Sequence, residues 1–124
     1  GQAVITAVSN AGMDPIPVTG QDATVGGIQN VLAGTQSMTV YKAIRAEARA
    51  AAGLAIAIVN NNQSAIELLA SGSVFNGTND IPSILLVPVS VTADNVAETV
   101  IADGFRTWDE ICVGDFEQFC PADR

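Results

Sequence analysis

Apolar and polar positions recur along the chain with two different spacings, which predict helices and short strands. Helical spacing of apolar residues predicts helices over 3–10, 23–32, 43–59 and 93–102, with a further helical turn over 64–69. Runs of β-branched and aliphatic residues predict strands over 18–19, 37–41 and 84–91, and a short one at 74–75 inside a polar loop. Strands that alternate with helices indicate an α/β fold with a parallel sheet.

Each of the first two predicted strands is followed by one charged residue before the next helix. Asp22 follows Val18-Thr19-Gly20-Gln21, and Lys42 follows Met38-Thr39-Val40-Tyr41. Open α/β sheets bind their ligands at the carboxyl ends of the strands. We therefore expect Asp22 and Lys42 to lie at one edge of the sheet and to be the candidate ligand-binding residues.

The chemistry of this pair suits a polyhydroxylated ligand. Sugar hydroxyls both donate and accept hydrogen bonds, whereas an ionised carboxylate only accepts and an ammonium group only donates. The alternative is structural: the two residues form a surface ion pair, or Asp22 caps the helix that begins near Ala23.

Four other side chains receive less weight. Gln21 and Gln36 lie near the same loops, and we expect them to orient a carboxylate or to bond the backbone and not to touch the ligand. Tyr41 points opposite to Lys42 in a strand of period two, so we interpret it as core packing. Trp108, the only tryptophan, is interpreted as a packing anchor of the C-terminal tail.

Composition excludes several classes of function. The chain of 124 residues has 13 acidic and 5 basic residues, a formal charge of −8, and no histidine. This charge repels phosphate backbones, so we expect no nucleic-acid partner. No histidine is available as a general base or metal ligand, and no phosphate-binding loop or nucleophile elbow occurs. We expect no enzyme activity, no cofactor and no metal.

Cys112 and Cys120 lie eight positions apart near the C-terminus. Zinc normally takes four cysteine or histidine ligands, so a disulfide is the better interpretation. A disulfide places the protein outside the cytoplasm. The alternative is two reduced cysteines that pack within the tail.

Two motifs carry a resemblance to a known family. Gly-Gln-Asp-Ala at 20–23 and Gly-Thr-Gln-Ser-Met-Thr-Val-Tyr-Lys at 34–42 resemble the C-terminal part of periplasmic sugar-binding proteins of ABC importers, the xylose-binding type in particular. The resemblance implies two α/β lobes, three hinge crossings and a monosaccharide closed between the lobes. It also implies that Asp22 and Lys42 contact the sugar, and that the partners are a monosaccharide and an ABC permease.

The resemblance further implies how the chain divides. Residues 1–83 would form part of the C-terminal sugar-binding lobe, 84–91 the last hinge-crossing strand, and 92–124 a helix and tail that pack on the N-terminal lobe. That lobe is missing from this sequence, so Val96, Val100 and Ile101 would be exposed. We expect the chain to self-associate or to pair with the missing lobe.

Localisation follows from the same resemblance, as periplasmic or extracellular and attached to the cell surface. The first residues lack the pattern of a signal peptide, so we expect any such segment to have been removed. Ala43 stands where the family usually has proline, and the cysteine-containing tail has no place in the commoner family pattern.

Two alternatives to a transport function remain. One is a sugar-sensing domain of a transcriptional regulator, which shares this fold. The other, less favoured, is a receiver-like or hydrolytic enzyme that uses Asp22.

Overall fold

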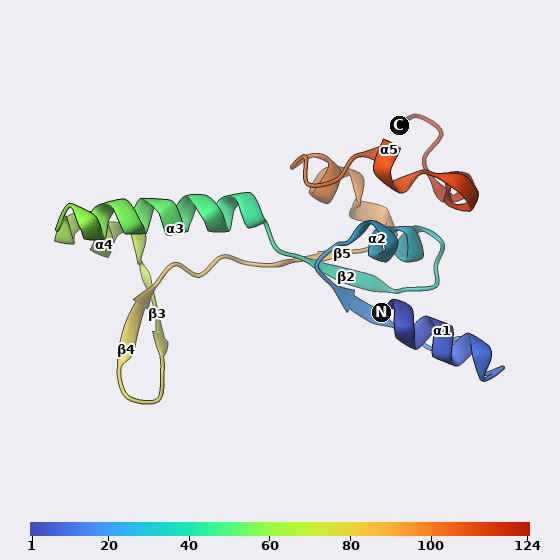
Figure 1. Cartoon of the computed structure of the whole chain (residues 1–124), viewed down its shortest axis with the longest axis horizontal. Helices are drawn as coiled ribbons and strands as arrows, with labels where there is room; N and C mark the ends of the chain where they lie inside the picture. The colour runs from blue at the N-terminus through green and yellow to red at the C-terminus, as the bar shows by residue number, and fades with distance from the viewer. The chain divides into compact units, whose positions relative to one another are not determined.

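The computed structural model describes residues 1–124, and the chain divides into two units (Figure 1). Unit 1 comprises residues 1–42 and 88–124, and unit 2 comprises residues 43–87. Both units contain helices and strands, which confirms the predicted α/β class.

The sheet of unit 1 has three strands in the order β1-β2-β5. The strands are β1 (Thr19–Gln21), β2 (Met38–Tyr41) and β5 (Val89–Val91). β1 and β2 are parallel, but β5 is antiparallel to β2, so the sheet is mixed where we predicted a parallel one. The reason is that the chain leaves unit 1 at the carboxyl end of β2 and returns there, with Val89 paired to Tyr41.

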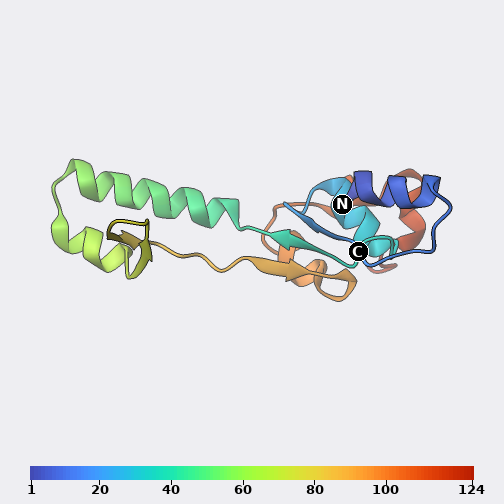
Figure 2. The same ribbon diagram turned by 90° about the horizontal axis from the view of Figure 1, so that it is seen from below.

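Helix α2 (Val25–Leu32) connects β1 to β2 and supplies much of the core of unit 1. Its Ile28 and Val31 are buried, as is Tyr41 of β2. The residue that caps α2 is Thr24, whose Oγ1 accepts from the Gly27 amide at 3.1 Å. Helix α1 (Gln2–Asn10), the dark blue helix of Figure 2, contains no buried residue.

The C-terminal tail is a series of short helical segments. They are a 3₁₀ turn (Ala93–Asn95), a π-helical segment (Ala97–Ile101), α5 (Trp108–Ile111) and a second 3₁₀ segment (Gly114–Phe119). The single helix predicted over 93–102 is therefore replaced by two segments of different pitch. The capping box at Thr107 is confirmed, because its amide donates to Glu110 Oε2 at 2.8 Å and its Oγ1 accepts from the Glu110 amide at 3.2 Å.

The tail packs within unit 1. Val96 is 1% exposed, and Val100 and Ile111 are 0% exposed. Gln29 of α2 donates to the Ile111 carbonyl at 2.8 Å, which joins α2 to the tail. The expected exposure of Val96 and Val100 is therefore wrong, because residues of this same chain cover both side chains.

A disulfide closes the end of the tail. Cys112 and Cys120 are bonded, as predicted from their spacing. Ile111, directly before Cys112, is the most deeply buried residue of α5. The disulfide thus ties the last residues to a helix that is anchored in the core of unit 1.

Unit 2 consists of a helix pair and a hairpin. Helix α3 (Ile44–Val59) packs on α4 (Gln63–Leu69), and β3 (Gly72–Phe75) pairs with β4 (Asp80–Ser83) in antiparallel register (Figures 1 and 2). Strand β4 was not predicted from the sequence. It contains Pro82, which cannot donate to a ladder and which a hairpin edge tolerates.

The predicted strand over 84–91 is wrong in its extent. Only Val89–Val91 forms a strand, and residues 84–88 have no regular structure. Pro88 explains the boundary, because proline has no amide hydrogen to donate and also restricts the residue before it.

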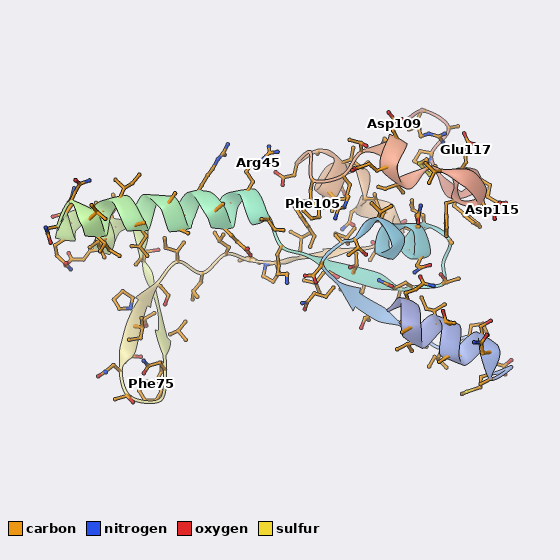
Figure 3. All side chains as sticks on the ribbon, in the orientation of Figure 1. Arg45, Phe75, Phe105, Asp109, Asp115 and Glu117 are labelled. Carbon is orange, nitrogen blue, oxygen red and sulfur yellow. A yellow bond between two sulfur atoms is a disulfide. The ribbon has the colours of Figure 1, made fainter.

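Unit 2 buries very little of its apolar surface. Only Ala57 and Ala70 are buried, whereas Val59 is 80% exposed and Leu68 is 81% exposed. Figure 3 shows Phe75 at the hairpin, where its ring is 64% exposed. Unit 2 therefore has no core comparable to that of unit 1.

No helix of the chain has both the length and the apolar character required to cross a membrane.

The packing of Ile111 generates a prediction about the stability of unit 1. We expect Ile111→Ala to lower the free energy of unfolding by about 2–5 kcal/mol, because it leaves a cavity at a fully buried position. Val113→Ala, at a 50% exposed position two residues away, is the control and should change it by less than about 1 kcal/mol. Urea unfolding followed by Trp108 fluorescence measures both, and equal effects would contradict the packing of the tail.

Candidate functional site

The first two strands of the sheet bring Asp22 and Lys42 together. β1 and β2 run parallel with Gln21 paired to Val40, so the next residues of each strand emerge at the same edge. Lys42 Nζ lies 2.6 Å from Asp22 Oδ1. The side chain of Lys42 is 39% exposed and that of Asp22 is 57% exposed, so a ligand can reach both. The prediction that Asp22 and Lys42 lie together at one edge of the sheet is confirmed.

The turn that carries Asp22 has an unusual backbone. Asp22 has φ 78° and Ala23 has φ 43°, although neither residue is glycine. The left-handed conformation costs a non-glycine residue about 1–2 kcal/mol, and such residues concentrate at functional sites. The Asp22 amide donates to the Val40 carbonyl at 2.8 Å, which extends the β1–β2 ladder by one bond into the turn.

The Asp22 carboxylate does not cap helix α2. Thr24 occupies the N-cap position and bonds the helix amide, as described above. One structural alternative for Asp22 is therefore removed. The exposed ion pair with Lys42 remains, and in such a pair both partners keep hydrogen-bonding capacity for a ligand.

Electrostatics favour the ionised form of Asp22. The hydrogen bond from Lys42 lowers the pKa of Asp22 below its ordinary value of 3.8, and the charge of Lys42 and a hydrogen bond from Gln21 act in the same direction. Partial desolvation opposes them with a smaller effect than the Lys42 hydrogen bond. At neutral pH the site presents a hydrogen-bond acceptor beside a donor.

The two glutamines near these loops, Gln21 and Gln36, lie in different places. Gln21 is exposed and bonds the Asp22 side chain. Gln36 is 3% exposed and donates to the Met38 carbonyl at 2.9 Å, at the beginning of β2. Since Lys42 follows the other end of that strand, Gln36 bonds the backbone and touches neither charged residue.

The two aromatic residues considered above, Tyr41 and Trp108, both belong to unit 1. Tyr41 is 3% exposed, packs on Phe105 with ring centroids 5.0 Å apart, and donates to Asp103. Trp108 is half-buried in the tail. Tyr41 therefore packs in the interior of unit 1, as predicted, whereas the role of Trp108 as a packing anchor stays a prediction.

Two contacts at the site were missed by sequence analysis. Thr39 Oγ1 accepts from the Ala23 amide at 3.2 Å, and Arg106 Nε donates to the Ala23 carbonyl at 3.2 Å. The role of Thr39 could have been suspected from the sequence, because Thr39 belongs to the motif at 34–42 that ends in Lys42. Arg106 lies 83 residues from Ala23, and no local pattern indicates that contact.

The chain contains no group of three or more acidic, histidine or cysteine side chains that could hold a metal ion. A groove of about 690 Å³ is lined by residues of α1 and of the segment before β1, including Ile5, Val8, Met13 and Ile16. This lining is mostly apolar and includes neither Asp22 nor Lys42. The groove and the Asp22–Lys42 ion pair are therefore two separate places on unit 1.

Comparison with known proteins bears out the resemblance. No family model matches the chain. It is 41% identical to the D-xylose-binding periplasmic protein of Escherichia coli (strain K12) over 108 residues, which are 86% of this chain and 32% of that protein. It is 37% identical to the D-xylose-binding periplasmic protein of Haemophilus influenzae, again over 108 residues, 86% of this chain and 31% of that protein.

A solved structure gives the same result. The solute-binding protein of a carbohydrate transporter from Chloroflexus aurantiacus, in complex with D-glucose, superposes with a TM-score of 0.78 at 33% sequence identity. The match covers 88% of this chain and 31% of that one. The chain thus spans about a third of the length of the proteins it matches, and its predicted similarity to periplasmic sugar-binding proteins is confirmed.

The ion pair generates a prediction about the pKa of Asp22. We expect Lys42→Met to raise this pKa toward 3.8, because the hydrogen bond that lowers it is lost. In the unaltered chain the pair stabilises the fold above pH 3.8, and this contribution disappears as the pH falls through the lowered pKa. Carboxyl carbon shifts followed by NMR measure the titration.

Lys42→Arg is the matched control, since it keeps a cationic donor and should keep the pKa low. An Asp22 pKa that is the same in Lys42→Met and in the unaltered chain would show that the two side chains do not pair in solution.

Proposed function

We propose that this chain belongs to a periplasmic solute-binding protein that captures a monosaccharide, xylose or a related aldose, for uptake by an ABC transporter. The observation that carries the proposal is the Asp22–Lys42 pair at the carboxyl ends of two parallel strands. The names of the similar proteins support the ligand class, because they refer to D-xylose and D-glucose.

The pair provides complementary groups for one sugar. The Asp22 carboxylate accepts from hydroxyl groups, and Lys42 donates to hydroxyl or ring oxygens. Each charge is already partly compensated by the other, so a neutral ligand can be bound without leaving an isolated charge in the closed site. The chain has no histidine, and we propose that neither residue takes part in covalent chemistry.

We propose a division of the chain that differs from the one expected from the resemblance. Unit 2, residues 43–87, is the part that packs on the missing lobe, whereas the tail belongs with residues 1–42. Burial supports this division: Val96, Val100 and Ile111 are covered within unit 1, but unit 2 leaves twelve large apolar side chains exposed. These are Ile44, Ile56, Ile58, Val59, Leu68, Leu69, Val74, Phe75, Ile81, Leu85, Leu86 and Val87.

The chain passes between the units twice, after Lys42 and before Pro88. We propose that these two passages are two of the three hinge crossings that the resemblance implies. Lys42 is then a ligand contact at the start of a crossing, where lobe closure would bring groups of the rest of the protein toward it.

Sugar affinity of the full-length protein tests the proposed function. We expect Asp22→Ala and Lys42→Ala each to weaken xylose or glucose binding roughly ten- to a hundredfold, the usual effect of losing a hydrogen bond to a charged group. Isothermal titration calorimetry measures the affinity. Asp115→Ala, an exposed carboxylate of the tail, is the control and should bind sugar as before. Unchanged affinity in both site variants would remove the pair from the binding site.

The exposed apolar side chains of unit 2 generate a prediction about association. We expect the isolated chain to self-associate, because twelve large apolar side chains of unit 2 are exposed and their burial against a partner is favourable. Val59→Asp combined with Leu68→Asp should reduce association measured by light scattering, whereas Val113→Asp in unit 1 should not. A monomeric unaltered chain would contradict the proposed role of unit 2.

A further inference from the structure

The turn at Asp22 and Ala23 is a strained element whose geometry determines the direction of the Asp22 side chain. Two successive non-glycine residues with positive φ are not stable by themselves, so surrounding groups must hold them. Ala23 is 0% exposed, and its amide and carbonyl therefore require partners inside the protein.

The partners come from two distant parts of the chain. The Ala23 amide donates to Thr39 Oγ1 at 3.2 Å, a buried contact from β2, where Thr39 is itself 0% exposed. The Ala23 carbonyl accepts from Arg106 Nε at 3.2 Å, a contact from the C-terminal tail. With the bond from the Asp22 amide to Val40, the turn is held from both sides.

Arg106 is itself held in place. Its guanidinium lies 4.3 Å from the centre of the Phe105 ring, and Phe105 packs on Tyr41 of β2. A cation above an aromatic ring is attracted to it, and this restricts the flexible arginine side chain. The position of Arg106 Nε is thus linked to β2, the strand that Lys42 directly follows.

We propose that Thr39 and Arg106 are positioning residues of the candidate site: their hydrogen bonds to Ala23 hold the strained turn so that the Asp22 carboxylate meets Lys42. The sugar-binding consequence rests on the proposed function, but the geometric claim does not. It follows that the C-terminal tail, through Arg106, supports a site whose charged residues are Asp22 and Lys42, far away in sequence.

The first test uses Thr39, because its substitution changes no charge. We expect Thr39→Val, which keeps the shape and removes the hydroxyl, to raise the pKa of Asp22 toward 3.8 in the intact chain, as the carboxylate moves away from Lys42. Thr39→Ser restores the acceptor and should keep the pKa low. NMR titration of the carboxyl group measures all three proteins, with Ile111→Ala as a variant that destabilises unit 1 without touching the turn.

An Asp22 pKa that is unchanged in Thr39→Val would overturn the proposal, as would an equal shift in Ile111→Ala. Where Thr39→Val does not fold, Arg106→Met and Arg106→Lys give the same comparison at high salt, which screens the loss of charge. The methionine side chain cannot donate to the Ala23 carbonyl, whereas the lysine side chain can, so a raised Asp22 pKa is expected in the methionine variant alone.

The second test separates this proposal from the proposed function. In the full-length protein we expect Thr39→Val to weaken xylose or glucose binding about tenfold and Thr39→Ser to bind nearly as tightly as the unaltered protein. A raised Asp22 pKa with unchanged sugar affinity would support the positioning role and overturn the use of Asp22 in binding. Weaker binding with an unchanged pKa would overturn the positioning role.

Discussion

The parallel pairing of β1 with β2 is the constraint on which the candidate site depends. Parallel strands emerge at the same edge of a sheet, so residues that are twenty positions apart in sequence become direct neighbours. The ladder extends past Gln21 through the bond from the Asp22 amide to Val40, and the Asp22–Lys42 distance of 2.6 Å follows from that register. A slip of one residue in this pairing would turn either side chain to the opposite face.

The C-terminal tail stabilises the same region by returning to it. Ile111 is fully covered in unit 1, Gln29 bonds its carbonyl, and Arg106 bonds the carbonyl of Ala23. These contacts join segments separated by more than eighty residues, since the sequence separations of the two hydrogen bonds are 82 and 83. The disulfide between Cys112 and Cys120 forms a covalent loop that begins directly after Ile111. The tail is therefore fixed to unit 1 at this buried residue.

The two units differ in how much of their own apolar surface they bury. Unit 1 buries apolar side chains from α2, β2 and the tail, including Ile28, Tyr41 and Ile111. Unit 2 has an apolar helix pair and hairpin with only Ala57 and Ala70 buried. Hydrophobic burial is the main favourable term in folding. Unit 2 has many apolar residues but buries few of them, so it gains little of this stabilisation by itself.

Local patterns along the sequence determined most helices, the first two strands and the capping box at Thr107, because caps, glycines and alternating residues act over a few positions. The sequence also showed that Asp22 and Lys42 each follow a strand, but the parallel pairing of β1 with β2 is what joins them. The antiparallel direction of β5, the hairpin strand β4 and the burial of Val96 and Val100 were decided only by tertiary structure. Each depends on where a distant segment returns, and so does the bond from Arg106 to Ala23. Such contacts are stabilised by the burial of apolar surface and by hydrogen bonds to buried backbone groups. A short stretch of sequence does not indicate which distant segment will supply these partners.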